Sequence, residues 1–265
     1  MARTIVFFHA HPDDEAIATG GTMARHSDAG DRVVAVFATR GELGEVDDGV
    51  LHDGEELWQR RVRETEAAAA ILGTARVEWL GYRDSGMHGE ETNHHADAFA
   101  AASVDEAAEK LARLLRDEHA DALVVYDDHG GYGHPDHIQV HVVGVEAAQR
   151  AGVANVYEAT MNRDAIKRQL EMAREAFPEF GEEMPEIKEE GPERFGSPDA
   201  IITTRIDVSE WIDRKRESLK AHASQIPESS FFLQMPPEAF RESFGTEWYI
   251  HRGVPSETRE TELFQ

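Results

Sequence analysis

The chain has 265 residues, a formal net charge of −25 at pH 7 and no cysteine. A chain of this length can bury a substantial core, and the lack of cysteine excludes disulfides, thiolate metal sites and a cysteine nucleophile. The acidic balance argues against a nucleic-acid partner, because phosphates bind to positively charged surfaces. No apolar run approaches the roughly 20 residues of a membrane span, and the first residues turn polar too soon for a signal peptide. We therefore expect a cytoplasmic protein.

Short β-rich runs alternate with helical stretches over residues 1–160, the expected core. In chain order we expect a strand at 4–10, a helix at 16–29, a strand at 32–39, a helix at 55–72, a strand at 76–80, a helix at 104–119, a strand at 122–126, a helix at 136–151 and a strand at 153–160. This alternation predicts an α/β fold with a Rossmann-like, mostly parallel sheet flanked by helices. Ligand sites in such sheets lie beyond the carboxyl ends of the strands.

The whole chain, residues 1–265, is expected to form a single domain. Residues 171–194 contain nine glutamates, three basic residues and three prolines. This composition favours an exposed, mobile connection over a lid that gates the substrate. Residues 200–265 are expected to add a strand at 201–208, a helix at 210–222 and an irregular tail, and to close over the main sheet.

Two histidine-rich motifs stand at the expected ends of the first and fourth strands, each just before a helix. They are HAHPDDE, from His9 to Glu15, and DDHGGYGHPDH, from Asp127 to His137. Taken alone, the first could be a helix N-terminus capped by aspartate, and the second a polar, glycine-rich turn. Together they place histidines and carboxylates at adjacent strand ends, a ligand set typical of Zn²⁺ with an open position for water. Such a site makes water a nucleophile near neutral pH.

The residues His11-Pro12-Asp13-Asp14-Glu15 and His134-Pro135-Asp136-His137 together resemble the motifs of the LmbE / PIG-L family of zinc-dependent de-N-acetylases. The resemblance implies a Rossmann-like fold and hydrolysis of N-acyl amides, usually on glucosamine-type sugars. It extends over most of the chain. Further segments resemble the subgroup that acts on mycothiol and its precursor, or other family features: 39–45, 61–64 with 72–73, 81–87, 130–133, 215–225 and 231–232.

The resemblance also implies a metal centre with a general base beside it. His11, Asp14 and His137 would bind Zn²⁺, with Fe²⁺ as the alternative metal. Asp13 would lie next to the metal without binding it and would take a proton from the attacking water.

Further roles are implied for the second motif. His134 would stabilise the tetrahedral oxyanion and protonate the leaving amine. Asp136 would orient His134 and raise its pKa by pairing with the imidazolium. Tyr132 would reach the oxyanion from a mobile, glycine-flanked loop, the alternative being a surface aromatic residue.

Three residues match family positions that hold sugar or inositol hydroxyls: Glu42, Arg61 and Asp84. Arg61 has the alternative of a solvated helix face, and Asp84 that of a turn-forming residue before a glycine. His222 matches a C-terminal family motif, for which a structural role is expected rather than a ligand role.

The sequence thus predicts a zinc-dependent hydrolase that removes an N-acyl group, most simply N-acetyl, from a glucosamine-type sugar. A mycothiol S-conjugate amidase is the alternative. The expected partner is therefore a small amino-sugar or thiol-conjugate substrate. The sequence is also compatible with a homo-oligomer. A nucleotide-binding Rossmann enzyme is disfavoured, because HAHPDD replaces the phosphate-binding G-x-G-x-x-G after the first strand. A non-catalytic sugar- or metal-binding protein would not need the unligated carboxylate of Asp13.

Overall fold

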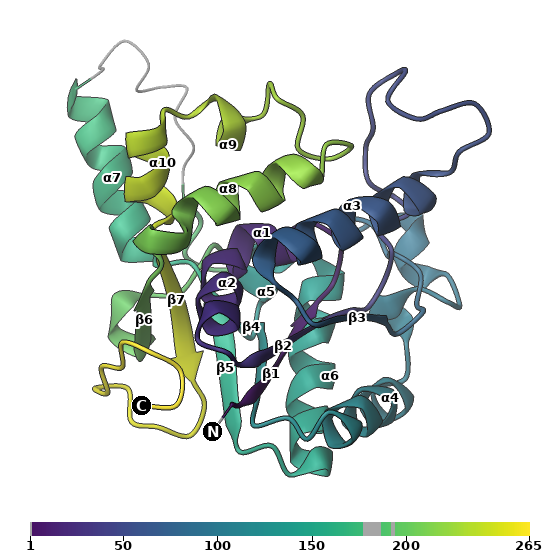
Figure 1. Ribbon diagram of the computed structural model, residues 1–265, viewed down its shortest axis with the longest axis horizontal. Helices are drawn as coiled ribbons and strands as arrows, with labels where there is room; N and C mark the ends of the chain where they lie inside the picture. Colours follow the sequence, from purple (N-terminus) through teal and green to yellow (C-terminus); the bar gives the residue numbers. More distant parts are fainter. Residues whose placement is uncertain (1, 177–186, 192–193) are drawn as a thin grey trace.

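A computed structural model describes residues 2–176, 187–191 and 194–265, which form one mixed sheet between two layers of helices (Figure 1). Five parallel strands make its centre: β1 Thr4–His9, β2 Arg32–Phe37, β3 Arg76–Trp79, β4 Ala122–Tyr126 and β5 Asn155–Thr160. The strand order is β3-β2-β1-β4-β5-β7-β6, in which β7 Thr246–His251 is antiparallel to both β5 and β6 Thr204–Asp207. The Rossmann-like, mostly parallel sheet is confirmed.

The central strands are buried on both faces, as their continuous apolar sequences require. In β1, Val6 and Phe8 pack into one core, whereas Ile5 and Phe7 pack into the other. The first core is covered by α4 Val104–Asp117 and α6 Pro135–Ala151. The second is covered by α2 Gly20–Asp28 and α3 Leu57–Leu72, over which α8 Ile212–Ala221 packs (Figure 1).

The helix expected at residues 16–29 is divided into α1 Asp14–Ala18 and α2. Between them, Thr19 departs from helical geometry, with φ −136° and ψ 3°, and its hydroxyl lies 3.1 Å from Nε2 of the buried His9. The backbone N–H groups of Gly21 and Thr22 then donate to the carboxylate of Glu247, at 2.8 and 2.9 Å. These contacts with β1 and β7 give α2 its own N-terminus, and the sequence periodicity alone does not show them.

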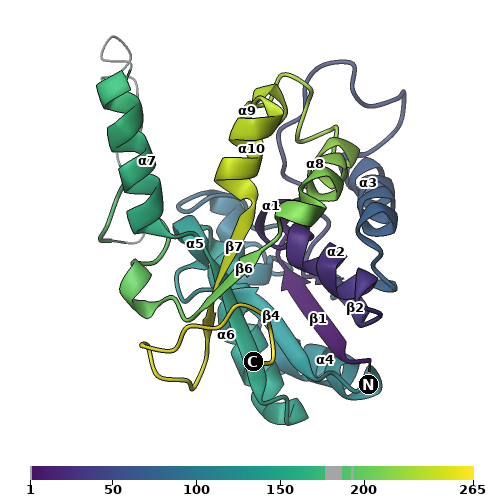
Figure 2. The ribbon, with the colours of Figure 1, turned by 60° about the vertical axis from the view of Figure 1, so that its left-hand side comes forward.

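The prediction of an irregular tail after residue 222 is wrong. This part of the chain contains α9 Phe231–Gln234, α10 Pro237–Phe244 and the strand β7. Figure 2 shows α10 leading into β7 beside β6. In β7 the polar Glu247 and His251 are buried, whereas Trp248 is only partly covered. This inverts the usual alternation of a half-buried strand. Glu247 is tolerated inside because Nζ of the buried Lys215 lies 2.6 Å from its carboxylate.

The remaining elements are short or peripheral. They are α5 Gly130–Gly133, α7 Arg163–Ala176 and the 3₁₀ helices Glu91–His94, Phe99–Ala101, Asp199–Ile201 and Ser209–Trp211. The first six residues of the expected mobile connection, 171–176, end helix α7, and most of the rest of it, 177–186 and 192–193, lies outside the described residues. In the part of the chain that is described, no helix combines the length and apolar character of a membrane span.

Gly144 marks the place where α6 crosses β4. A Cβ atom at this position would lie 2.4 Å from Cγ1 of Val125, closer than non-bonded carbons approach. We expect Gly144→Ala to lower the free energy of unfolding by about 1–3 kcal/mol through overpacking. Denaturant unfolding measures this, with Val142→Ala, exposed on the same helix, as a control expected to stay within about 0.5 kcal/mol of the parent. Equal stability of the two variants would contradict the close approach of α6 to β4.

Candidate metal centre and active site

The loops after β1 and β4 meet at the carboxyl edge of the sheet, because these two strands are neighbours. His11 follows β1, whereas His134 and His137 precede and begin α6. Each of the three buried imidazoles offers a nitrogen within 4.8 Å of the others. Asp14, the first residue of α1, joins them: its Oδ2 lies 3.5 Å from Nδ1 of His11 and 3.4 Å from Nε2 of His137. The predicted ligands therefore converge.

The arrangement of His11, Asp14 and His137 fits a divalent cation. Nε2 of His137 is buried and has no hydrogen-bond partner among the described residues, a costly state unless another group satisfies the atom. Ligand atoms about 2.1 Å from a tetrahedral cation lie roughly 3.4 Å from one another, close to the separations of Asp14 Oδ2 from both imidazoles. Two histidines and one carboxylate suit Zn²⁺ and Fe²⁺ alike, so these residues can bind a metal.

His11 is oriented by carboxylates on its far side. Its Nε2 lies 3.0 Å from Oδ2 of Asp136 and 3.5 Å from Oδ1 of Asp84. Burial alone would lower the pKa of His11, but the hydrogen bonds to Asp136, Asp14 and Asp84 raise it well above its ordinary value. Because Nε2 is engaged by Asp136, Nδ1 is the nitrogen left to face Asp14. A carboxylate behind a histidine ligand is the usual support of a metal site.

The predicted pairing of the Asp136 carboxylate with the His134 imidazolium is wrong, because the carboxylate pairs with His11. The charge of Asp136 does raise the pKa of His134, as predicted, but larger effects outweigh it. The Asp136 carboxylate accepts hydrogen bonds from the backbone N–H and hydroxyl of Ser85 and pairs with His11. His134 caps α6, and its Nδ1 accepts the backbone N–H of Asp136 at 3.1 Å. Burial, together with the neighbouring His11 and His137, lowers the pKa of His134 to about 4. His134 is thus neutral near pH 7, with its proton on Nε2, because Nδ1 is already an acceptor.

Asp13 lies beside the histidines in a strained backbone conformation. Its φ is +93°, and positive φ in a residue other than glycine costs about 1–3 kcal/mol. Its carboxylate accepts a hydrogen bond from Nη2 of Arg61 at 3.2 Å. Burial raises the pKa of Asp13 to about 6, although Arg61 opposes the change. A carboxyl group with a pKa this close to neutrality suits proton transfer.

Arg61 is buried rather than solvated, so the alternative of an exposed helix face is excluded. Its Nη1 donates to the carbonyl of Gly41 at 2.9 Å, and its Nη2 donates to the carbonyl of Pro12 as well as to Asp13. Helix α3 thereby fixes both the loop after β2 and the first motif. Nη1 and Nη2 are thus bound within the protein, whereas the buried Nε has no hydrogen-bond partner among the described residues.

Asp84 and Glu42 also lie at this edge of the sheet. Asp84 accepts the N–H of Gly86 at 2.9 Å, as its turn-forming alternative predicts, and the N–H of Leu43 at 3.3 Å. Glu42 accepts the N–H of Asp84 at 3.1 Å. The carboxylate of Asp84 also approaches His11. The structure thus brings the predicted substrate residues close to the metal group, while their contacts with substrate stay a prediction.

Tyr132 is the one exposed residue among the predicted site residues, all of which lie in the described part of the chain. It is 39 % exposed and sits on α5 between Gly131 and Gly133, whose φ angles are +75° and +94°. Its ring meets that of His137 edge-on, with 5.0 Å between centroids, and faces His134 at 6.3 Å. Tyr132 therefore covers the histidines from the solvent side.

Two pairs that support the site were not predicted. Tyr126 stacks on His137, with ring centroids 4.4 Å apart and planes at 16°, and its hydroxyl lies 2.9 Å from Nδ1 of His9. The second pair is Glu15 with His222, whose Nε2 lies 2.6 Å from the Glu15 carboxylate. His222 is thus placed behind the first motif and outside the metal group, in agreement with a structural role. Because Tyr126 stands at the end of an apolar strand, the sequence did not indicate that it contacts the site.

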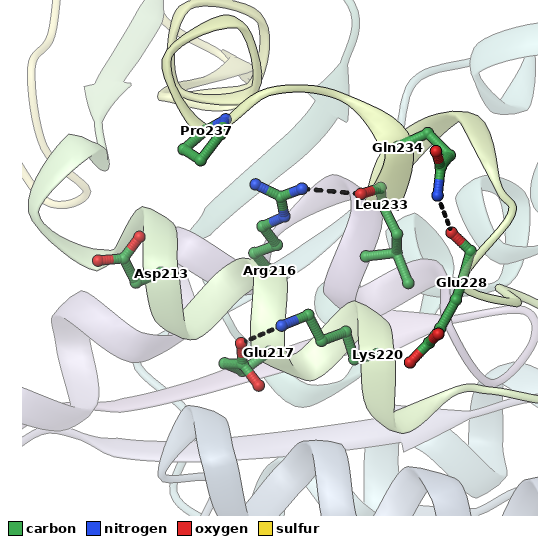
Figure 3. Close-up of a pocket in the computed structure, with 8 residues that line it drawn as sticks. All are labelled: Asp213, Arg216, Glu217, Lys220, Glu228, Leu233, Gln234 and Pro237. Atoms are coloured by element: carbon green, nitrogen blue, oxygen red, sulfur yellow. Dashed lines mark hydrogen bonds and ion pairs between the residues drawn. The ribbon is translucent and has the colours of Figure 1, made fainter.

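Two of the surface pockets lie apart from the histidines. One, of about 440 Å³, is formed by α8, α9 and the start of α10, and Figure 3 shows Arg216 donating to the carbonyl of Leu233 and Lys220 pairing with Glu217 there. None of the residues that line it is a predicted site residue. The other, of about 730 Å³, includes Glu42 in its wall. The metal group is therefore identified by its donor atoms and not by either cavity.

A Rossmann-like sheet that carries a group of His and Asp side chains able to bind a metal, with a further carboxylate next to it, is typical of metal-dependent hydrolases. The sequence profile of the PIG-L family, described as GlcNAc-PI de-N-acetylase, matches residues 6–148. The chain belongs to the PIG-L family, as its two motifs predicted, and the prediction of an enzyme that hydrolyses an amide bond is confirmed.

Similarity to individual proteins extends over the whole chain. The 1D-myo-inositol 2-acetamido-2-deoxy-alpha-D-glucopyranoside deacetylase of Acidothermus cellulolyticus is 39% identical over 279 aligned residues, which cover 100% of this chain and 95% of the relative. The protein of the same name from Saccharomonospora viridis is 36% identical, with 98% and 99% covered. The solved N,N'-diacetylchitobiose deacetylase from Pyrococcus horikoshii superimposes with a TM-score of 0.61 at 22% identity, covering 96% of this chain and 85% of that one. This last likeness shows a shared fold.

Proposed function

We propose that this protein is a zinc-dependent deacetylase that removes the N-acetyl group from an N-acetylglucosaminyl-inositol, the substrate class for which its relatives are named. The observation that carries the proposal is the position of Asp13, whose carboxylate is held by Arg61 next to Asp14 and outside the group of His11, Asp14 and His137. A protein that only bound sugar or metal would have no use for a strained, partly buried base at this point.

His11, Asp14 and His137 would hold the cation. When bound, it would polarise the amide carbonyl and make the attacking water more acidic. Asp13 accepts the proton of that water, for which its raised pKa is suited. The same proton must later reach the leaving amine, and Asp13, which holds it, would deliver it. Neutral His134 would keep its Nε2 proton, because giving it up would leave an imidazolate.

The developing oxyanion would be stabilised by two donors. Neutral His134 offers Nε2–H, because its Nδ1 is fixed as an acceptor by the backbone of Asp136. Tyr132 offers its hydroxyl, which keeps its proton, because partial desolvation against the histidines and the nearby charge of Asp14 raise the pKa of Tyr132 above the ordinary value. Donors fixed in a site that excludes water stabilise negative charge more than water does. Glu42 and Asp84 would accept hydrogen bonds from sugar hydroxyls, whereas Arg61 would both contact the sugar and hold Asp13.

The proposal is tested by incubating the zinc-loaded protein with N-acetylglucosaminyl-inositol, simpler N-acetylglucosaminides and cysteinyl S-conjugates of mycothiol, and measuring released primary amine. We expect the inositol glycoside to have the highest kcat/KM. The chelated protein is the control and should release none. Release from the S-conjugates alone would favour the amidase alternative, and release from no member of the panel would contradict the proposal.

Tyr132→Phe removes only the hydroxyl that the proposal directs at the oxyanion. Loss of a sole oxyanion donor costs about 10²–10³-fold in kcat, and we expect a loss nearer 10-fold because His134 remains. Metal content and stability should be unchanged, since Tyr132 is exposed and its contacts are ring contacts. Steady-state kinetics measure the effect, and unchanged kcat would remove Tyr132 from the mechanism.

Zinc as the resident metal, a cytoplasmic location and a homo-oligomer remain predictions. Elemental analysis of protein purified without added metal distinguishes Zn²⁺ from Fe²⁺. Cell fractionation tests the location, and light scattering gives the oligomeric state.

A further inference from the structure

The strained backbone of Asp13 needs something to hold it. Among the described residues other than glycine, only Asp13, His119 and Phe264 have a positive φ, and such a conformation persists where surrounding contacts determine it. The carbonyl of Asp13 accepts N–H groups of Ala16 and Ile17 at the start of α1. These bonds are ordinary helix contacts, so they do not explain why the residue before the helix takes this conformation.

The N–H of Asp13 is held by Glu15. It donates to Oε2 of Glu15 at 2.9 Å, a contact that folds the Glu15 side chain back over the preceding turn. Glu15 is only 2 % exposed, and a buried carboxylate needs partners for both oxygens. Its other oxygen, Oε1, lies 2.6 Å from Nε2 of His222. The side chain that holds Asp13 is therefore itself held by His222.

His222 comes from the far end of the chain, 207 residues after Glu15. It follows α8, which packs on α1, α2 and α3 (Figure 1). The imidazole is 0 % exposed, and its Nδ1 has no hydrogen-bond partner in the described part of the chain. Glu15 is thus the one side chain among those residues that hydrogen-bonds to this imidazole. A buried histidine that served only packing would be replaced at less cost by an apolar side chain.

We propose that Glu15 and His222 are positioning residues for catalysis: His222 fixes Glu15, and Glu15 fixes the backbone of Asp13 so that its carboxylate faces the attacking water. This inference rests on the proposed role of Asp13 as the general base. It makes the C-terminal part of the chain necessary to complete a site whose chemistry lies in the first motif.

The test compares two substitutions of His222. His222→Gln keeps an N–H donor near the position of Nε2 and should retain kcat within a few-fold of the parent. His222→Leu has a similar size but no donor, and we expect kcat to fall by about 10–100-fold with KM and bound metal unchanged. Selective loss of kcat indicates an effect on the reacting geometry and not on binding.

A matched control is the pair of His251 with Glu260, which is also buried, with His251 Nδ1 3.0 Å from the carboxylate. His251→Leu should lower stability to a similar degree and leave kcat per folded molecule unchanged. If His222→Leu does not fold, Glu15→Asp serves instead, because the side chain shortened by one methylene cannot reach both partners. It should show the same selective loss of kcat.

A double-mutant cycle separates positioning from general stability. If His222 acts through Asp13, His222→Leu should have no further effect on the residual kcat of Asp13→Asn. An equal loss in both backgrounds, or an unchanged kcat of His222→Leu in the parent, would overturn the inference while leaving Asp13 as the base. If Asp13→Asn itself keeps full kcat, the proposed function of Asp13 fails instead, and the two failures are distinguishable.

Discussion

Replacing His137 by alanine is expected to abolish metal binding and with it turnover. The substitution removes Nε2, the buried atom that lies 3.4 Å from Oδ2 of Asp14 and has no hydrogen-bond partner among the described residues. Only His11 and Asp14 would then remain, and catalytic sites of this kind use three protein ligands. Metal per chain by elemental analysis should fall from about one to near zero. The rate of amine release should fall to that of the chelated parent.

Thermal unfolding gives a second readout that does not depend on activity. A ligand that binds only the folded state raises its stability by about 2.7 kcal/mol at a hundred times its Kd. Chelation should therefore lower the Tm of the parent and leave that of His137→Ala unchanged. His52→Ala, which replaces an exposed histidine in the loop before α3, is the control and should behave like the parent. Full metal occupancy in His137→Ala would contradict the ligand assignment.

The central sheet could be predicted because its strands carry their own signal. The runs at 33–37 and 122–126 are continuously apolar and buried on both faces, and Gly73 and Gly152 end α3 and α6 in left-handed conformations. β7 could not be recognised in the same way. Its buried positions include Glu247 and His251. These polar side chains are stabilised in the interior because they pair with Lys215 and Glu260. No local pattern records those partners.

The same reason limits what the sequence shows of the site. Histidines and carboxylates were expected to converge because they follow strand ends that the topology makes neighbours. The resemblance to the family then singled out His11, Asp14 and His137 as the predicted metal ligands. The carboxylate of Asp136 was assigned to His134, two residues away, but it pairs with His11, 125 residues away. In the first turn of α6, the backbone N–H of Asp136 donates a hydrogen bond to His134, whereas the Asp136 side chain points to His11. The contacts of Arg61 with Asp13 and of His222 with Glu15 likewise join segments that are distant in the sequence. Only the three-dimensional structure shows them.

Asp13→Asn should keep the metal and lose most of its turnover, whereas Asp14→Asn should lose affinity for the metal. The two aspartates are adjacent, and each is only partly covered. They differ in what they face: Asp14 Oδ2 faces His11 and His137, whereas Asp13 Oδ2 receives the hydrogen bond of Arg61. An amide cannot accept the proton of the attacking water, and loss of a general base costs roughly 10²–10⁴-fold in kcat, about 3–5 kcal/mol of barrier.

Measuring metal per chain, KM and kcat for both variants separates binding from chemistry. Asn is close to Asp in size and can still accept a hydrogen bond from Arg61, so the fold should survive in Asp13→Asn. A ligand contributes to the affinity for the cation, so excess metal should partly restore Asp14→Asn. Excess metal should do nothing for Asp13→Asn, because its cation is already in place. Rescue of Asp13→Asn by metal, or full activity of Asp14→Asn without it, would exchange the two roles and show that the base is not the strained aspartate.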